Sequence, residues 1–249
     1  MRLTIPTILR LVALALLIAF IVSPQLFEPV FRPLTRNNAP AIYNQGSLLS
    51  LTFMHLRTVL IATVAATIVA VGLAILVTRP VGAEFLPLSR SIVNIGQTFP
   101  PVAVLALAVP AVGFGEKPTL IALFLYGLLP IFENTLTGLT TLPGNVTEAA
   151  RGLGMTNRQK LFKIELPLAA PVILAGIRLS VVISLATATI GSTVAAKTLG
   201  EVIIAGLLSN NLAFILQGGL IVGILAVLIY DSLSAIERAV AKRMGRAAV

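Results

Sequence analysis

Long apolar segments separated by short polar ones make up most of the chain. Six apolar runs are long enough to predict membrane-crossing helices, at residues 11–22, 55–77, 91–112, 119–141, 168–191 and 213–233. They lack the alternation of apolar and polar positions that is typical of strands in outer-membrane barrels. The pattern therefore predicts an all-α integral membrane protein with about six transmembrane helices.

Three segments deviate from this simple pattern. The first run is short and follows Arg2 and Arg10, as a signal peptide would. Because no small-residue cleavage site follows it, we expect a retained helix. Residues 28–47 contain several Pro and Asn residues and predict a loop. Residues 192–212 are too polar for a full span and predict a re-entrant or half helix that lines a cavity.

Composition agrees with a membrane protein, since 57% of the residues are hydrophobic and 11% are charged, against about 25% charged in soluble domains. The net charge of +9 comes from basic residues between the runs, which favours lipid headgroups over nucleic acid as their partners. With no Cys and one His, disulfides, iron–sulfur clusters and ordinary zinc sites are excluded. The chain has no P-loop motif of its own, and we expect no cofactor and no catalytic activity.

The basic residues also predict the orientation in the membrane. Six spans place both termini on one side, and positive residues favour the cytoplasm. Of the 18 Lys and Arg residues, thirteen fall on the side of the termini: Arg2, Arg10, Arg79, Arg90, Arg151, Arg158, Lys160, Lys163, Arg178, Arg238, Lys242, Arg243 and Arg246. We therefore expect cytoplasmic termini and one transmembrane domain, residues 1–249, with its core at about 50–233.

A polar insert, Glu148–Pro167, interrupts the apolar pattern with six charged residues in twenty positions. It reads as two short helices on the cytoplasmic side. We expect Thr147 to cap the first, Gly154 to end it in a left-handed conformation, and Thr156 with Gln159 to form a capping box at the second. Such a segment is either a solvated loop or a helix that docks in a groove of a soluble partner.

The insert contains E-A-A-x-x-x-G followed by I-x-L-P, which resembles the EAA motif of permease subunits of ATP-binding-cassette importers. The matching residues are Glu148, Ala149, Ala150, Gly154, Ile164, Leu166 and Pro167. The resemblance implies the type I importer permease fold, with a cytoplasmic loop at about 144–167 whose coupling helix sits in a cleft of the ATPase subunit.

Further segments are similar to the osmoprotectant branch of these permeases, which imports glycine betaine, choline, carnitine and related compounds. Residues that match this branch are Gln97, Pro100, Tyr126, Pro130, Asn134, Thr135, Gly138, Gly176, Arg178 and Asp231. Two departures stand out. The chain has A-A-K-T-L-G at 195–200 where the branch has G-A-G-G-L-G, and Glu133 stands where the branch has a basic or apolar residue.

Polar residues inside predicted spans are candidates for a translocation pathway. Glu133 falls near the middle of the fourth run, where a carboxylate is costly. It is either functional, part of a buried ion pair, or a protonated acid between helices. Gln97, Thr98 and Pro100 fall within the third run, where proline bends a helix and frees backbone carbonyls. Asn134 follows Glu133. We expect His55 and Arg57 to mark the outer membrane interface.

The resemblance implies a permease subunit that moves a small quaternary amine and couples its passage to ATP hydrolysis by a partner. The implied partners are a second permease subunit, identical or related, two ATPase subunits, a separate periplasmic or extracellular solute-binding protein, and membrane lipid; no nucleic acid is expected. The expected location is the bacterial cytoplasmic membrane. The alternatives are a permease for an amino acid or another small polar solute, and an ion-coupled transporter that uses Glu133.

Overall fold

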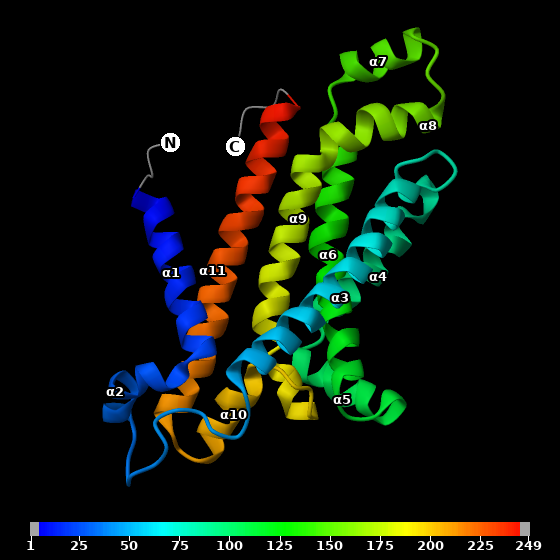
Figure 1. Cartoon of the computed structure of the whole chain (residues 1–249). Helices are drawn as coiled ribbons and strands as arrows, with labels where there is room; N and C mark the ends of the chain where they lie inside the picture. The colour runs from blue at the N-terminus through cyan, green and yellow to red at the C-terminus, as the bar shows by residue number, and fades with distance from the viewer. Residues whose placement is uncertain (1–4, 245–249) are drawn as a thin grey trace. The chain divides into compact units, whose positions relative to one another are not determined.

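The computed structural model describes residues 5–244, and every regular element in that range is a helix. Arg2 and Arg246, two of the basic residues used to predict orientation, lie outside it. The α-helices, coloured by residue number in Figure 1, are α1 (Ile5–Val22), α2 (Glu28–Phe31), α3 (Leu48–Val77), α4 (Leu86–Thr98), α5 (Pro101–Val112), α6 (Glu116–Thr140), α7 (Gly144–Gly152), α8 (Asn157–Lys160), α9 (Leu166–Thr187), α10 (Gly200–Leu208) and α11 (Leu212–Arg243).

Helix length and composition agree with a multi-pass membrane protein. Four helical segments are long and apolar enough to cross a membrane: Leu48–Val77, Glu116–Thr140, Asn157–Thr187 and Leu212–Arg243. Two pairs, Thr7–Val22 with Pro24–Leu34 and Ala83–Thr98 with Pro101–Val112, pass the same test together but are bent at a short break. Within the described residues this gives four to six candidate spans, and six if each bent pair is one span.

The third predicted span is broken rather than continuous. Helix α4 ends at Thr98, and α5 begins at Pro101. Phe99 between them is extended, with φ −94° and ψ 139°, because a residue before proline is disfavoured in the helical region. Since Pro100 and Pro101 both lack an N–H, two consecutive helical hydrogen bonds cannot form. The third run is therefore bent at its prolines, as predicted, but it forms two helices rather than one.

Two predicted non-spanning segments contain short helices. The expected loop at 28–47 begins with α2 and a 3-10 turn at Arg32–Leu34. The segment at 192–212 contains a 3-10 turn, Ile190–Val194, and the nine-residue helix α10. Between them Ala195 adopts a left-handed conformation with φ 64°, at the position of the first glycine in the osmoprotectant pattern. A short helix here was expected.

The chain divides into two compact units. The first comprises Met1–Ile61, Pro101–Leu123 and Ser184–Ile229, and the second comprises Ala62–Pro100, Phe124–Ile183 and Tyr230–Val249. Helices α3, α6, α9 and α11 contribute residues to both.

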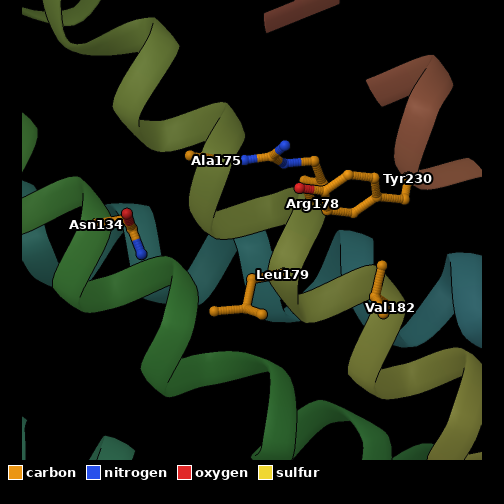
Figure 2. A pocket seen from close by; sticks show the side chains of 6 residues that line it. All are labelled: Asn134, Ala175, Arg178, Leu179, Val182 and Tyr230. Carbon is orange, nitrogen blue, oxygen red and sulfur yellow. The ribbon is translucent and has the colours of Figure 1, made fainter. Parts of the chain in front are cut away.

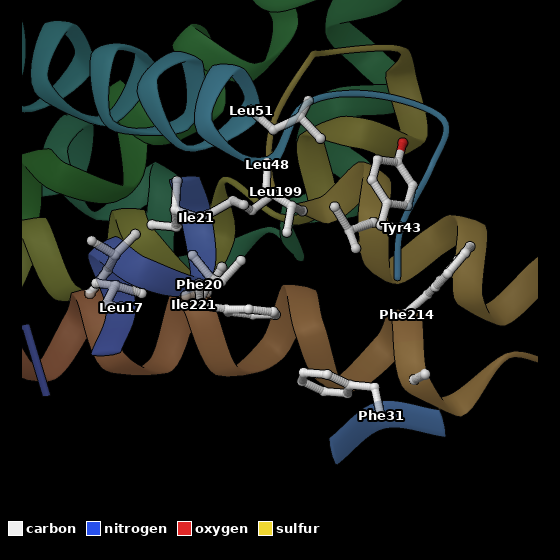
Figure 3. Close-up of a cluster of buried hydrophobic side chains, with 14 of the residues drawn as sticks. Leu17, Phe20, Ile21, Phe31, Tyr43, Leu48, Leu51, Leu199, Phe214 and Ile221 are labelled. Carbon is white, nitrogen blue, oxygen red and sulfur yellow. The ribbon is translucent and has the colours of Figure 1, made fainter. Parts of the chain in front are cut away.

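In the core of the first unit, the loop after α2 packs against α10 and α11 (Figure 3). The Tyr43 ring meets the Phe214 ring edge to face, with centroids 5.4 Å apart. The Tyr43 hydroxyl donates to the Glu201 carboxylate at 2.9 Å, and burial together with this carboxylate raises the pKa of the phenol above its usual range. The buried Gln217 side chain accepts from the Tyr43 N–H and donates to the Ala41 carbonyl.

His55 in the first unit is fully buried by protein groups, and its place at the outer membrane interface stays a prediction. Its Nε2 donates to the Leu185 carbonyl at 3.1 Å. Leu185 lies in the last turn of α9, where carbonyls lack helical partners, so His55 satisfies a free end of that helix. Arg57, in contrast, is exposed and pairs with Glu116 at 2.6 Å.

Small residues allow the helices of the second unit to pack closely. Ala66, Ala70 and Ala74 form a fully buried stripe on α3 at four-residue spacing. Between α6 and α9 the contact is tighter still, because a Cβ at Gly176 would lie 2.7 Å from both the Pro130 carbonyl oxygen and the Asn134 Cβ. Gly176 is therefore required for this helix crossing.

This contact gives a stability prediction. We expect Gly176→Ala to lower the free energy of unfolding by about 1–3 kcal/mol, because the added methyl group meets backbone that cannot move aside. The matched control is Gly223→Ala on α11, where nothing lies within 4 Å of the added Cβ; its effect is neutral or stabilising by up to about 1 kcal/mol. The midpoint of unfolding in detergent measures both. Equal midpoints for the two variants would contradict the close crossing.

Candidate functional site

The polar insert begins within α7, which follows α6 and is followed by α8 (Figure 1). Helix α7 begins at Gly144, after Pro143, without a side-chain cap. Thr147 therefore lies inside the helix, where its hydroxyl donates to the Gly144 carbonyl at 2.8 Å. The predicted Thr147 cap was wrong, because the Pro143-Gly144 pair starts the helix one turn earlier.

The end of α7 matches the prediction. Gly154 has φ 68°, a conformation that glycine adopts without steric cost. The Met155 N–H donates to the Ala150 carbonyl at 3.1 Å, and the Gly154 N–H donates to the Arg151 carbonyl at 2.9 Å. These two bonds are the Schellman motif, which reverses the chain directly after a helix.

Helix α8 begins with the predicted capping box. The Thr156 hydroxyl accepts from the Gln159 N–H at 3.3 Å, and the Gln159 side chain accepts from the Thr156 N–H at 2.9 Å. Both halves of the reversal from α7 to α8 are thus fixed by local hydrogen bonds. The insert is an ordered helical hairpin rather than an irregular loop.

A π-helical turn, Leu161–Glu165, joins α8 to α9. Pro167 cannot donate to the carbonyl four residues before it, and its ring would clash there. The chain widens instead, and the Leu166 N–H donates to the Leu161 carbonyl five residues back. The chain therefore enters the regular helix α9 through an irregular turn just before Pro167.

The predicted coupling residues divide into exposed and buried ones. Glu148, Ala149 and Gly154 are exposed, Ala150 is buried, and Ile164, Leu166 and Pro167 are half-buried. Two large apolar side chains of the insert also stand out, with Leu153 76% and Phe162 66% exposed. The insert therefore exposes both apolar side chains and the Glu148 carboxylate.

Sequence reasoning missed the ion pairs of Glu165. This residue is buried, although it occupies the variable position of I-x-L-P. Its Oε2 accepts from Arg79 Nη2 at 2.6 Å, and its Oε1 lies 3.2 Å from Lys160 Nζ. Lys160, five residues earlier, gave a weak local signal, but Arg79 is 86 positions away and nothing in the sequence pairs it with Glu165.

Gln97, a predicted pathway residue, holds the broken helix α4 to α6. Its side chain donates to the Tyr126 carbonyl at 3.0 Å. This carbonyl lacks its usual helical donor because the residue four positions later, Pro130, has no N–H. In return the Tyr126 hydroxyl donates to the Phe99 carbonyl at the break. The proline spacing in the sequence could have shown that the Tyr126 carbonyl needs a partner.

The other predicted pathway residues have separate surroundings. Thr98 is exposed, and its hydroxyl donates within its own helix to the Ile95 carbonyl. Pro100 lies in the break. Glu133 pairs with Arg90, whose Nε and Nη2 lie 3.0 and 3.3 Å from its two carboxylate oxygens. This ion pair is partly exposed rather than buried, and a pathway role for Glu133 stays a prediction.

A cavity of about 300 Å³ lies between α6, α9 and α11 (Figure 2). Asn134 lines it, and its amide also donates to the Pro130 carbonyl at 2.8 Å. Across the cavity the Arg178 guanidinium lies over the Tyr230 ring, 4.6 Å from its centroid, and pairs with Glu237 at 3.2 Å. The residues Gln97, Thr98, Pro100 and Glu133 are not in its lining.

Comparison with known families gives a match over most of the chain. Residues 70–246 match the family described as "Binding-protein-dependent transport system inner membrane component". This range contains the polar insert and the predicted pathway residues.

Similar sequences carry related names. The osmoprotectant import permease protein OsmY of Salmonella typhimurium is 40% identical over 191 residues, covering 77% of this chain and 80% of that protein. The choline transport system permease protein OpuBB of Bacillus subtilis is 41% identical over 196 residues, covering 78% and 89%. The carnitine transport permease protein OpuCB of Listeria monocytogenes is 41% identical over 195 residues, covering 78% and 88%.

Solved structures agree on the fold. A chain of the MetNI methionine ABC transporter, in an inward-facing conformation, superposes with a TM-score of 0.70 at 22% identity, covering 78% of this chain and 95% of that chain. A chain of an amino acid ABC transporter solved with histidines gives a TM-score of 0.65 at 17% identity, covering 88% and 98%. The predicted type I importer permease fold is confirmed.

The contact between Gln97 and the free Tyr126 carbonyl gives a second prediction. We expect Gln97→Leu to lower the free energy of unfolding by about 1–3 kcal/mol, because it leaves the carbonyl of a buried residue without a donor. In a Pro130→Ala background the same change costs less, since an alanine at that position supplies the missing N–H. Thermal unfolding of the four proteins in detergent measures this double-mutant cycle, and full additivity would contradict the role given to Gln97.

Proposed function

The chain belongs to the family of inner membrane components of binding-protein-dependent transport systems, and from this premise we propose that it is the permease subunit of an ABC importer for a small quaternary amine such as glycine betaine or choline. The observation that carries the proposal is the polar insert, an ordered hairpin that exposes Leu153 and Phe162. An ordered helix with exposed apolar side chains suits docking in a groove of another protein. The names of the similar permeases support the solute class.

The proposed assembly contains two permease subunits, identical or related, and two ATPase subunits that receive the polar inserts. A separate solute-binding protein delivers the solute from the outside. ATP hydrolysis belongs to the ATPase subunits, so this chain is not itself an enzyme. Both termini and the polar insert lie in the cytoplasm, which the distribution of Lys and Arg supports.

The proposed cycle is alternating access. Binding of ATP closes the ATPase subunits and draws the two polar inserts together. The Schellman motif at Gly154 and the capping box at Thr156 keep each hairpin rigid, so the displacement reaches the membrane helices. The broken helix α4 with Gln97, Thr98 and Pro100, together with Glu133 and Asn134 on α6, is the candidate pathway.

Solute recognition is proposed to occur mainly in the separate binding protein. A quaternary ammonium is typically held by a cage of aromatic rings. This chain has no Trp and three Tyr residues, and all three are engaged: Tyr43 with Glu201, Tyr126 with the Phe99 carbonyl and Tyr230 with Arg178. The same permease could serve an amino acid or another small polar solute, which keeps that alternative open.

The proposal is tested by coexpressing the chain with its cognate ATPase and solute-binding protein, followed by reconstitution in vesicles. We expect ATP-dependent uptake of radiolabelled glycine betaine or choline that requires the binding protein. Uptake of a radiolabelled amino acid instead would replace the solute class and leave the permease role intact. Solute movement that needs no ATPase would contradict the permease role itself.

The turn at Gly154 gives a prediction about docking. We expect Gly154→Ala to reduce copurification of the ATPase by about threefold or more, because a left-handed alanine costs about 1 kcal/mol and shifts the hairpin. The matched control is Gly152→Ala, where an added Cβ meets nothing within 4 Å and φ is not left-handed. Equal copurification for both variants would show that the reversal does not position the docking surface.

A variant of Glu133 distinguishes the proposed ABC permease from an ion-driven transporter. We expect Glu133→Gln to lower the free energy of unfolding by about 1 kcal/mol or less, since the pair is partly exposed. Uptake by the wild-type protein depends on ATP and does not respond to a pH gradient imposed across vesicles without ATP. Gradient-driven uptake that Glu133→Gln abolishes would favour the ion-driven alternative.

A further inference from the structure

We propose that Arg79, Lys160 and Glu165 form a latch that makes α4 follow the polar insert. The three are positioning residues: they touch neither solute nor nucleotide, and they determine where a displacement of the insert is delivered. The inference rests on the proposed function, because it assumes that a motor moves the insert. It concerns residues outside the predicted set of coupling residues.

The latch is compact and shielded from water. The Glu165 side chain is 7% exposed, and the Lys160 and Arg79 side chains are 15% and 26% exposed. Each carboxylate oxygen of Glu165 has one cationic partner: Oε2 accepts from Arg79, and Oε1 pairs with Lys160. A carboxylate at this depth is strongly destabilised when it loses its partners, so the three groups move together rather than separate.

Arg79 lies in a tight turn that joins α3 to α4. The Arg79 N–H donates to the Leu76 carbonyl at 3.1 Å, and the Gly82 N–H donates to the Arg79 carbonyl at 2.9 Å. The turn approaches the end of α3 so closely that a Cβ at Gly82 would lie 2.2 Å from the Leu76 carbonyl oxygen. A displacement of Arg79 therefore carries the start of α4, at Leu86, with it.

Helix α4 passes the displacement along its length. Arg90, near its start, pairs with Glu133 on α6, and Gln97, near its end, binds the Tyr126 carbonyl of the same helix. Directly after Gln97 comes the break at Phe99 and Pro100. The latch thus connects the polar insert to the broken end of α4, where three of the predicted pathway residues lie.

The latch is needed because the helix is irregular where the polar insert meets α9. The π-helical turn Leu161–Glu165 and Pro167 lack regular helical hydrogen bonding. A force on α8 would bend the chain at this point and be lost before it reached the rest of α9. Because Glu165 is in the π-helical turn and is bound by Arg79, the force reaches α4 instead.

The first test measures coupling in the reconstituted complex with the copurifying ATPase, using radiolabelled glycine betaine as the probe. We expect Arg79→Gln and Glu165→Gln to keep ATP hydrolysis within about twofold and to lower the solute moved per ATP by about 3- to 30-fold. The exchange of Arg79→Glu with Glu165→Arg restores part of this ratio. The matched control is Arg57→Gln, which breaks an ion pair of the same 2.6 Å length outside the insert and leaves the ratio unchanged.

The outcomes separate the alternatives. An unchanged ratio in Arg79→Gln, or a parallel loss of ATP hydrolysis and uptake with no rescue by the exchange, would overturn the latch and leave a merely structural ion pair. If the wild-type chain neither retains an ATPase nor supports ATP-driven uptake, the proposed function fails first. Wild-type coupling together with normal coupling in the variants refutes the latch alone.

A second measurement does not depend on how well the variants fold. The chain contains no Cys, so spin labels can be placed at Val81→Cys, in the turn after α3, and at Lys163→Cys, in the π-helical turn; both side chains are exposed. In the labelled complex we expect the same distance between the labels without nucleotide and with trapped ATP. A change of several ångströms would show that the turn and the insert move separately and would overturn the latch.

Discussion

Backbone carbonyls that lose their helical donors must find other donors in apolar surroundings, and the fold depends on the side chains that supply them. Gln97 binds the Tyr126 carbonyl that Pro130 leaves free. His55 binds the Leu185 carbonyl near the end of α9, and Gln217 does the same for a carbonyl outside the helices, that of Ala41 in the loop after α2. Each of these polar side chains is far in sequence from the carbonyl it binds. Side chains from distant parts of the chain thus supply donors where helical ones are missing.

The same constraint explains how a transporter can contain both rigid and deformable parts. In the polar insert, local caps at Gly154 and Thr156 make the hairpin rigid. At Pro167 the regular bond is missing, and the wider π-helical turn replaces it. The buried carboxylate of Glu165 lies in that turn and takes its partner from the α3–α4 turn. The proposed coupling requires three parts: a rigid helical hairpin, a deformable π-helical turn, and an ion pair that links this turn to the α3–α4 turn.

Local patterns in the sequence predicted the features that depend on neighbouring residues. The capping box at Thr156, the left-handed Gly154 and the apolar helices were found because their partners lie within a few positions. Pro100 and Pro101 predicted a bend in the third run, but not that a helix would end at Thr98, because one apolar run covers both halves. The Thr147 cap was wrong because Pro143 starts the helix earlier. The partners of Glu133 and Glu165 could not be predicted, since a pattern along the chain does not show which distant cation will lie beside a carboxylate.

The central claim is that the polar insert lies in the cytoplasm and bears on an ATP-driven partner. The most direct measurement places one cysteine at exposed Arg158 in this cysteine-free chain and labels it with a membrane-impermeant maleimide in sealed vesicles of both orientations. We expect labelling from the cytoplasmic face alone, slowed when the ATPase is bound and changed again by ATP. Labelling from the external face, or a rate that neither ATPase nor ATP alters, would contradict it.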